Sequence, residues 1–205
     1  MAEARHIWIT KRQPFMANLL TRIGFIDETS VKTNMAKTTG WAPRGERLVD
    51  HAPFGHWQTQ TFIAALRHDR LDAPSPLSLG PMALQWQLID GPINRDLFDL
   101  YVETQLAPTL QKGDVIILDN LSSHKSPKAA QMLKDIGCWF LPLTPYSPDL
   151  NPIEMAFAKL KALLRKAAAR TYDDLWKAVG TVCDLFTEDE CLNYFIAAGY
   201  EPDWT

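Results

Sequence analysis

Three acidic residues occupy positions where a carboxylate can do chemistry. Asp27 ends the apolar run "IGFID", Asp119 ends the run "VIILD", and Glu154 closes the segment "YSPDLNPIE", residues 146 to 154. An apolar run that leads into a carboxylate predicts a buried strand with the acid at its end. Because groups at strand ends of an α/β sheet gather in one crevice, we expect the three carboxylates to meet there.

The residue types favour a particular chemistry. Crowded carboxylates repel one another unless a cation neutralises them. Hard oxygen ligands select Mg²⁺ or Mn²⁺, and Mg²⁺ takes further ligands from water and substrate phosphate. Two such ions about 4 Å apart can activate a nucleophile and stabilise the leaving oxygen of a phosphodiester. We therefore expect Asp27, Asp119 and Glu154 to be catalytic, metal-binding residues for phosphoryl transfer on nucleic acid.

Each carboxylate also has a purely structural interpretation. Asn151 can cap a helix with Pro152 in its first position, and Glu154 then sits where a carboxylate reaches back to the cap. Asp27 can belong to a turn after its strand, and Asp119 can cap the following loop. Taken one residue at a time, the local pattern leaves both interpretations open.

A basic segment follows Glu154. Between residues 155 and 172 there is no acidic side chain and there are five basic ones: Lys159, Lys161, Arg165, Lys166 and Arg170. On a helix that begins near Pro152, positions 154, 158, 161 and 165 share one face. We expect the first four basic residues to bind DNA phosphates beside the carboxylates, although a solvated helix face would explain the same charges.

The remaining patterns predict the elements that hold these residues. Short apolar runs predict strands at 23–28, 59–66, 115–118 and 138–141, and "GWAPRGERL" is typical of a turn between strands. Helices are expected from the caps Asn94 and Ser126, from Pro152 to about residue 170, and within 172–186 and 188–199. Residues 1–22 are weakly patterned, with Pro14 interrupting any helix, and are interpreted as a leader or arm. The order predicts an α/β domain with a mixed sheet and a helical C-terminal end.

Composition sets broad limits on the class of protein. The chain has 205 residues, of which 46% are hydrophobic and 22% charged, as in an ordinary globular domain. Its net charge of −3 argues against coating nucleic acid through bulk charge. No apolar run approaches the roughly 18 residues that span a bilayer, so we expect a cytoplasmic protein without a membrane partner. The three cysteines lack paired spacing and are expected to be reduced, mostly buried thiols.

Five segments resemble the catalytic region of bacterial insertion-sequence transposases of the Tc/mariner superfamily. They are "FIDET", "GWAPRGERL", "GHWQTQTFIAAL", "LAPTLQKGDVIILDNLSSHKS" and "LTPYSPDLNPIEMAFAKLKALLRKAAARTYDDLW". The 34 residues from 120 to 153 that separate Asp119 from Glu154 match the spacing of that branch. The resemblance implies a ribonuclease-H-like fold over residues 23–205, with a catalytic DDE triad at Asp27, Asp119 and Glu154. It also implies that His124 occupies a recurrent position near the active site, assigned here to DNA binding; a structural role in its loop is the alternative.

The same resemblance implies an activity and partners. These are Mg²⁺-dependent cleavage at transposon ends, attack of the freed 3′ hydroxyl on target DNA, and a homodimer assembled on DNA. Family members usually carry an N-terminal helix-turn-helix that reads the terminal repeats, and the segment before Asp27 is too short for one. Either an upstream reading frame supplies it, or the chain is a truncated copy. Residues 75–87 look like a loop insertion. The alternatives are a structure-directed nuclease on the same fold and a catalytically silent remnant that acts as an interaction module.

Overall fold

The computed structural model describes residues 2–37, 39–51, 53–54, 57, 59–72, 88–90, 93–121 and 124–201. The expected insertion at residues 75–87 lies outside them. Six strands form one sheet within the described part: β1 (Ile23–Lys32), β2 (Thr59–Arg67), β3 (Leu71–Asp72), β4 (Leu88–Asp90), β5 (Val115–Leu118) and β6 (Trp139–Pro142). The order is β3-β2-β1-β5-β6, with β4 also paired to β2. β1 pairs antiparallel with β2 and parallel with β5, and β5 pairs parallel with β6, so the mixed sheet expected from the sequence is confirmed.

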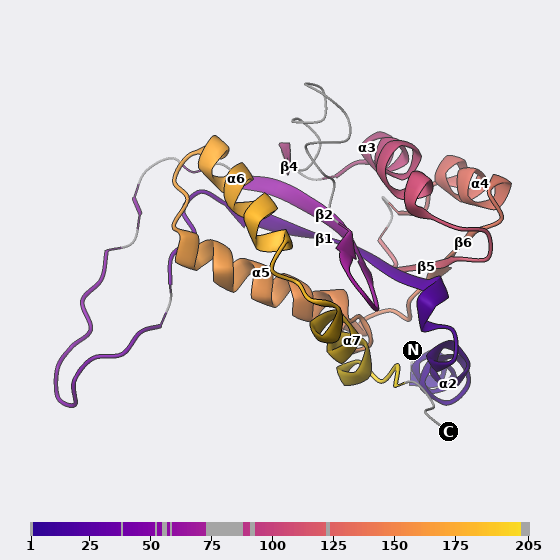
Figure 1. The fold of residues 1–205 in the computed structure, drawn as a ribbon, viewed down its shortest axis with the longest axis horizontal. Coiled ribbons are helices and arrows are strands. Elements are labelled where there is room, and N and C mark those ends of the chain that lie inside the picture. The colour runs from indigo at the N-terminus through magenta and orange to yellow at the C-terminus, as the bar shows by residue number, and fades with distance from the viewer. Residues whose placement is uncertain are drawn as a thin grey trace.

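Helices cover both faces of this sheet. Figure 1 shows α5 (Ile153–Ala167) and α7 (Glu188–Ala197) on one face, with α3 (Arg95–Tyr101) and α4 (Pro127–Asp135) on the other. α6 (Tyr172–Cys183) packs on α5. Two apolar cores result, and neighbouring strand residues alternate between them: Phe25 and Ile117 lie in the α5 core, whereas Ile26 and Ile116 lie in the α3–α4 core. This alternation explains the uninterrupted apolar runs, because both faces of the central strands are buried.

Local capping signals account for most helix starts. The side chain of Asn94 accepts a hydrogen bond from Leu97 N, and that of Ser126 accepts one from Ala129 N. Thr171 and Thr187 cap α6 and α7 in the same way. α5 ends earlier than expected because Ala168 adopts a left-handed conformation (φ 53°). No helix in the described part of the chain is long and apolar enough to cross a bilayer.

The N-terminal segment is more structured than its pattern suggests. α1 (Ala2–Ile7), a π-helical turn (Trp8–Arg12) and α2 (Gln13–Ala17) follow one another without a break, and a 3₁₀ turn (Leu20–Arg22) leads into β1. The expectation that Pro14 interrupts any helix was wrong, because Pro14 stands in the first turn of α2, where a missing N–H costs little. Trp8 is completely buried in the α5 core. The segment is therefore attached to the body of the domain.

The connection between β1 and β2 differs from the expected turn. Residues 33–58 join the two strands, and Figure 1 shows the described part of this connection extending away from the body of the molecule. We call it the arm. It carries exposed apolar side chains, including Trp41 at 98% exposure and Val49 at 75%. Arg170 holds the base of the arm, since its guanidinium donates to the carbonyl oxygens of Thr33 and Met35.

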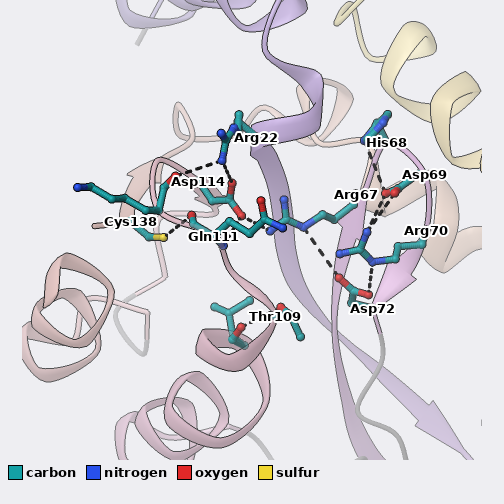
Figure 2. Close-up of polar contacts among 12 residues, drawn as sticks. Arg22, Arg67, His68, Asp69, Arg70, Asp72, Thr109, Gln111, Asp114 and Cys138 are labelled. Carbon is teal, nitrogen blue, oxygen red and sulfur yellow. Dashed lines mark hydrogen bonds and ion pairs between the residues drawn. The ribbon is translucent and has the colours of Figure 1, made fainter. Parts of the chain in front are cut away.

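A buried ion pair links the C-terminal end of β2 to the N-terminal end of β5, beside the start of β1 (Figure 2). Arg67 Nη2 lies 2.7 Å from Asp114 Oδ2, and both side chains are at most 5% exposed. Asp114 also accepts from Gln111 N, and Arg22 approaches it at 3.6 Å. Arg70, which is half exposed, pairs with Asp69 and Asp72 at the rim. The network lies at the start of the β1–β5 pairing, and Asp27 and Asp119 follow the last pair at its other end.

All three cysteines are unpaired. Cys138 and Cys191 are buried, and Cys183 is partly exposed. Burial raises the pKa of Cys183 to about 12 and that of Cys191 to about 11. Thiols with such pKa values stay protonated at neutral pH, which makes them poor nucleophiles and poor metal ligands.

Candidate active site

One cavity contains all three carboxylates singled out in the sequence. Its volume is about 740 Å³, and Asp27, Asp119 and Glu154 line it together with Glu28 and Asn151. The register explains part of the convergence: Ile26 pairs with Leu118 across the parallel strands β1 and β5, so Asp27 and Asp119 follow at the same level. Glu154 arrives from the first turn of α5, which packs on β1.

Asp27 stands within a strand and not at its end. β1 continues to Lys32 because residues 24–32 pair with β2 on the other side, beyond the last pair with β5. The expected strand end at Asp27 was therefore wrong, although the chain does leave its parallel neighbour there. Asp27 is 7% exposed, and both carboxylate oxygens accept hydrogen bonds: Oδ1 from Glu28 N at 2.7 Å, and Oδ2 from Asn151 Nδ2 at 2.8 Å.

Asn151 does not cap α5. The residue at the N-cap position is Pro152, and no side chain makes a capping bond there. The amide of Asn151 is instead turned into the protein, where it donates to Asp27 and leaves its Oδ1 buried without a hydrogen-bond partner among the described residues. Since α5 has no capping box, the cap interpretation of Glu154 fails. Glu154 is exposed to the cavity, free of a capping role.

The His124 ring contacts two carboxylates, those of Asp119 and Glu28. Its Nδ1 lies 2.7 Å from Asp119 Oδ1, and its Nε2 lies 3.3 Å from Glu28 Oε2. The ring packs on Phe98 with 4.8 Å between ring centroids. Its side chain has no exposed surface, so the prediction that His124 contacts DNA does not agree with its position. The imidazole holds the carboxylate of Asp119 in place instead.

Burial, hydrogen bonds and neighbouring charges shift the pKa values of Asp27 and His124 in this site. Burial raises the pKa of Asp27 to about 7, against the opposing hydrogen bond from Glu28 N, and the charges of Glu154 and Asp119 add to the rise. Burial lowers the pKa of His124, but hydrogen bonds to Asp119 and Glu28 outweigh it and bring the value to about 9. A buried carboxylate that resists ionisation beside two other acids is a group that a cation would stabilise.

The carboxylates line one cavity without forming a closed ligand cage. In the described part of the chain no three His, Cys, Asp or Glu side chains are arranged closely enough to enclose an ion. The donor set nonetheless suits a hard divalent cation, since it consists of carboxylate oxygens, and Asp27 has both oxygens oriented by neighbours. Asp27, Asp119 and Glu154 line one cavity and could thus hold Mg²⁺ or Mn²⁺.

The basic residues of α5 divide into two groups. Positions 154, 158, 161 and 165 form one outward side of the helix, with Lys161 and Arg165 partly exposed. Lys159 lies on a different side: its ammonium donates to Leu185 O, contacts Glu190 Oε2 and stacks on the ring of Phe186. Lys159, whose side chain is 26% exposed, is therefore already paired within the domain, and this pairing competes with its predicted role in DNA binding. Lys166 is exposed and shares the side of Lys159, seven residues away.

Several residues of the site could not be identified from the sequence. Glu28 had no predicted role, and Asn151 was predicted only as a cap. Lys125 and Tyr146 also line the cavity. Tyr146 is 89% exposed and has a left-handed backbone (φ 55°), a conformation that non-glycine residues adopt rarely. Its position after Pro145 in a turn gave no signal of either property.

Comparison with known proteins is consistent with this site. Residues 22–176 match the DDE superfamily endonuclease family, a range that includes Asp27, Asp119 and Glu154. None of the curated proteins searched matches the chain. Similar solved structures include the Mos1 transposase paired-end complex with left transposon end (TM-score 0.68, 16% identity, 93% of this chain and 60% of that chain). The Mos1 mariner paired-end complex with Mn gives a TM-score of 0.64 at 15% identity, over 95% of this chain and 60% of that one.

A third similar structure is confined to a catalytic domain. The Mos1 transposase catalytic domain with raltegravir and Mg gives a TM-score of 0.58 at 12% identity, over 93% of this chain and 90% of that chain. The chain thus spans about 60% of the length of the chains in the Mos1 paired-end complexes. These similarities confirm the ribonuclease-H-like fold and agree with the Tc/mariner resemblance at the level of fold. Because the family match covers most of the sequence, this chain belongs to the DDE superfamily endonuclease family.

Proposed function

We propose that this chain is the catalytic domain of a DNA transposase, which cleaves DNA at transposon ends and joins the freed 3′ end to target DNA. The observation that carries the proposal is the convergence of Asp27, Asp119 and Glu154 on one 740 Å³ cavity from adjacent strands and a helix start. Membership of the DDE superfamily endonucleases supports it, as does the similarity to Mos1 transposase structures that contain transposon ends.

Asp27, Asp119 and Glu154 are proposed to bind two divalent ions, Mg²⁺ or Mn²⁺. Ions bound by these carboxylates would activate the attacking oxygen and stabilise the leaving oxygen of a phosphodiester. The oxygen ligands support this choice, and Mos1 structures with Mn and with Mg use the same fold. The number of ions is part of the proposal.

The surrounding residues have separate tasks. Asn151 and Glu28 N hold the two oxygens of Asp27, and His124 holds Asp119, so both carboxylates are oriented before DNA arrives. On α5, Lys161 and Arg165 extend the site along the helix face of Glu154, where they would hold the phosphates that flank the scissile bond. Lys166 is assigned to more distant DNA.

The partners follow from the proposed reaction. They are transposon-end DNA and target DNA, brought together by a homodimer that assembles on the ends. A helix-turn-helix segment, supplied by another part of the intact transposase, would read the end sequences. Residues 23–205 form the proposed catalytic domain, with 1–22 as its N-terminal extension, and the cytoplasm is the proposed location.

Metal-dependent cleavage tests the proposal directly. Supercoiled plasmid is incubated with the chain in Mg²⁺ or Mn²⁺, and nicked product is measured for wild type, Asp119→Asn and Asp135→Asn. Asp135 is exposed at the end of α4, so its variant makes the same chemical change away from the cavity. Nicking should be lost in Asp119→Asn alone. Equal activity in Asp119→Asn would refute the assignment, and absence of nicking by all three proteins would support a silent remnant.

Strand transfer distinguishes a transposase from a nuclease on the same fold. An oligonucleotide that ends in a 3′ hydroxyl is labelled at its 5′ end and mixed with unlabelled plasmid. A transposase converts the label into plasmid-length product, because the 3′ hydroxyl attacks the target. Nicking without joined product would favour the structure-directed nuclease.

A further inference from the structure

Buried hydrogen bonds connect the N-terminal helix with Asp27. Trp8 Nε1 donates to Tyr200 Oη at 3.0 Å, and Tyr200 Oη donates to the carbonyl oxygen of Leu150 at 2.9 Å. The next residue is Asn151, whose Nδ2 donates to Asp27 Oδ2 at 2.8 Å. Trp8 and Tyr200 have no exposed surface, and Asn151 is 4% exposed. The path thus runs through buried groups from Trp8 to the proposed metal ligand Asp27.

Other contacts hold the same turn from outside. The 3₁₀ turn Pro148–Leu150 comes directly before Asn151, and Asp149 within it forms a two-point ion pair with Arg5 of α1. The N-terminal helix is itself tied to the C-terminal end of the domain, where Gln13 Nε2 donates to Ala198 O at 2.7 Å. Both chain ends therefore support the turn that places Asn151.

The oxygen and the nitrogen of the Asn151 side-chain amide differ in their hydrogen bonding. Its Oδ1 is buried and accepts no hydrogen bond from the described residues, which is unfavourable for a polar atom. The other half of the amide donates to Asp27. A residue chosen for packing alone would avoid the unsatisfied oxygen, so the donor to Asp27 accounts for the amide at this position.

We propose that Tyr200, itself held by Trp8, is a positioning residue for Asp27 and acts through the Leu150 carbonyl and the Asn151 amide. The proposal rests on the proposed function insofar as Asp27 is taken to bind metal. The hydrogen bond from Asn151 orients one carboxylate oxygen, and the backbone of residue 151 is fixed by the bond that its neighbour Leu150 accepts from Tyr200. Such outer partners typically change metal affinity by about 10- to 100-fold when they are lost.

Tyr200→Phe isolates the hydroxyl. The phenyl ring keeps the edge-to-face contacts with Phe25 and Phe195, whereas Leu150 O and Trp8 Nε1 lose their partner. Tyr194→Phe is the matched control, because it removes a tyrosine hydroxyl bond to Glu190 on α7, away from this path. Both variants are first checked for folding by thermal unfolding.

Two measurements on the full chain decide the proposal. The first is the side-chain amide resonance of Asn151 in metal-free protein, identified by its disappearance in Asn151→Ala. The second is Mn²⁺ affinity from the electron paramagnetic resonance signal of free Mn²⁺. Tyr200→Phe should shift the Asn151 amide resonance and weaken Mn²⁺ binding by about 10-fold, whereas Tyr194→Phe should change neither. In an Asn151→Ala background, Tyr200→Phe should weaken Mn²⁺ binding no further.

The possible failures are distinguishable. An unmoved Asn151 resonance with wild-type Mn²⁺ affinity in Tyr200→Phe would overturn the positioning role, even if the variant were less stable. If wild type and Asp27→Asn bind Mn²⁺ equally, the proposed function fails, while the Asn151 resonance still reports whether Tyr200 positions the amide. Should Tyr200→Phe not fold, Trp8→Phe removes the donor at the start of the path and is judged by the same two measurements.

Discussion

Asp27 is buried, has acidic neighbours and accepts hydrogen bonds from two donors. These features link its ionisation to the stability of the fold. Its pKa rises from 3.8 to about 7, mainly through burial. A raised pKa means that the folded chain favours the protonated form of Asp27. The stabilisation from protonated Asp27 is therefore complete below pH 3.8 and is lost as pH rises through about 7. Metal-free Asp27→Asn should therefore gain stability relative to wild type across that window.

The gain should reach up to roughly 4 kcal/mol, because each pKa unit corresponds to about 1.4 kcal/mol. Urea unfolding with EDTA, at pH values from 4 to 9, measures it. The pKa of His124 is raised from 6.5 to about 9, so its cation stabilises the fold fully below pH 6.5 and this contribution is lost as pH rises through about 9. His124 is present in both proteins, so its contribution cancels in their difference. Asp135→Asn serves as the exposed control and should show no trend. A difference between Asp27→Asn and wild type that stays constant with pH would contradict the raised pKa.

The role of a residue could be predicted from the sequence where its chemical type determines that role. It could not be predicted where the role depends on a partner far away in the chain. The types and positions of Asp27, Asp119 and Glu154 indicated an acidic site, and the structure brings them to one cavity. Asn151 satisfied every local rule for a cap, yet its amide bonds Asp27, 124 residues away. Similarly, no residue near His124 in the sequence indicated that Glu28 would be its second hydrogen-bond partner. Long-range pairing decides these roles, and periodicity carries no information about it.

At the scale of elements, α5 presents different sides to different partners. One side is buried in the core, one carries Glu154, Lys161 and Arg165, and a third directs Lys159 into α7. Sequence spacing defined these sides correctly, but it could not say which of them α7 would cover. The charges of the basic segment are therefore not equivalent, and substitution should separate them.

Replacing both Lys161 and Arg165 by alanine should weaken DNA binding and lower its salt dependence. Each lost phosphate contact reduces the slope of log K against log salt by about 0.9 on duplex DNA. The measurement is fluorescence anisotropy of a labelled duplex between low and moderate salt. Lys159→Ala should leave the slope unchanged and lower thermal stability, because it removes the contacts with Glu190 and Phe186. An unchanged slope in the double variant would identify its two residues as a solvated helix face.

The ion pair between Arg67 and Asp114 anchors the strand ends farthest from the cavity. Arg67→Met leaves the buried carboxylate of Asp114 with only its weaker partners, Arg22 and Gln111 N. Loss of one member of a buried pair typically costs 3 to 5 kcal/mol, and we expect about 3 here. Arg70→Met, at the exposed rim of the same cluster, should cost less than about 1 kcal/mol. Urea unfolding compares the two, and equal costs would show that burial of the first pair is unimportant.

At the scale of the whole molecule, the alternating strand and helix signals predicted the mixed sheet and the helical end correctly. They did so because each element has an apolar pattern matched to its own period. The N-terminal helix and the arm were not predicted. Trp8 has its partner at Tyr200, at the other end of the chain, and the arm has no periodic apolar face by which to recognise it. Burial of Trp8 depends on a surface that only the folded body provides, whereas the arm leaves the body and carries no pattern of its own.

The arm should be dispensable for folding of the body. None of the described residues between 36 and 57 belongs to either core, and Arg170 holds the connection at Thr33 and Met35. Replacing residues 36–57 by a four-residue Gly-Ser linker should therefore preserve the fold. Shortening the loop should even add about 1 kcal/mol, since each halving of loop length saves roughly 0.6 kcal/mol of closure entropy. Urea unfolding measures this gain, and Mn²⁺ affinity should remain that of the full chain. A less stable shortened chain would mean that the arm contributes packing to the body, and that its exposed Trp41 and Val49 have partners within the same molecule.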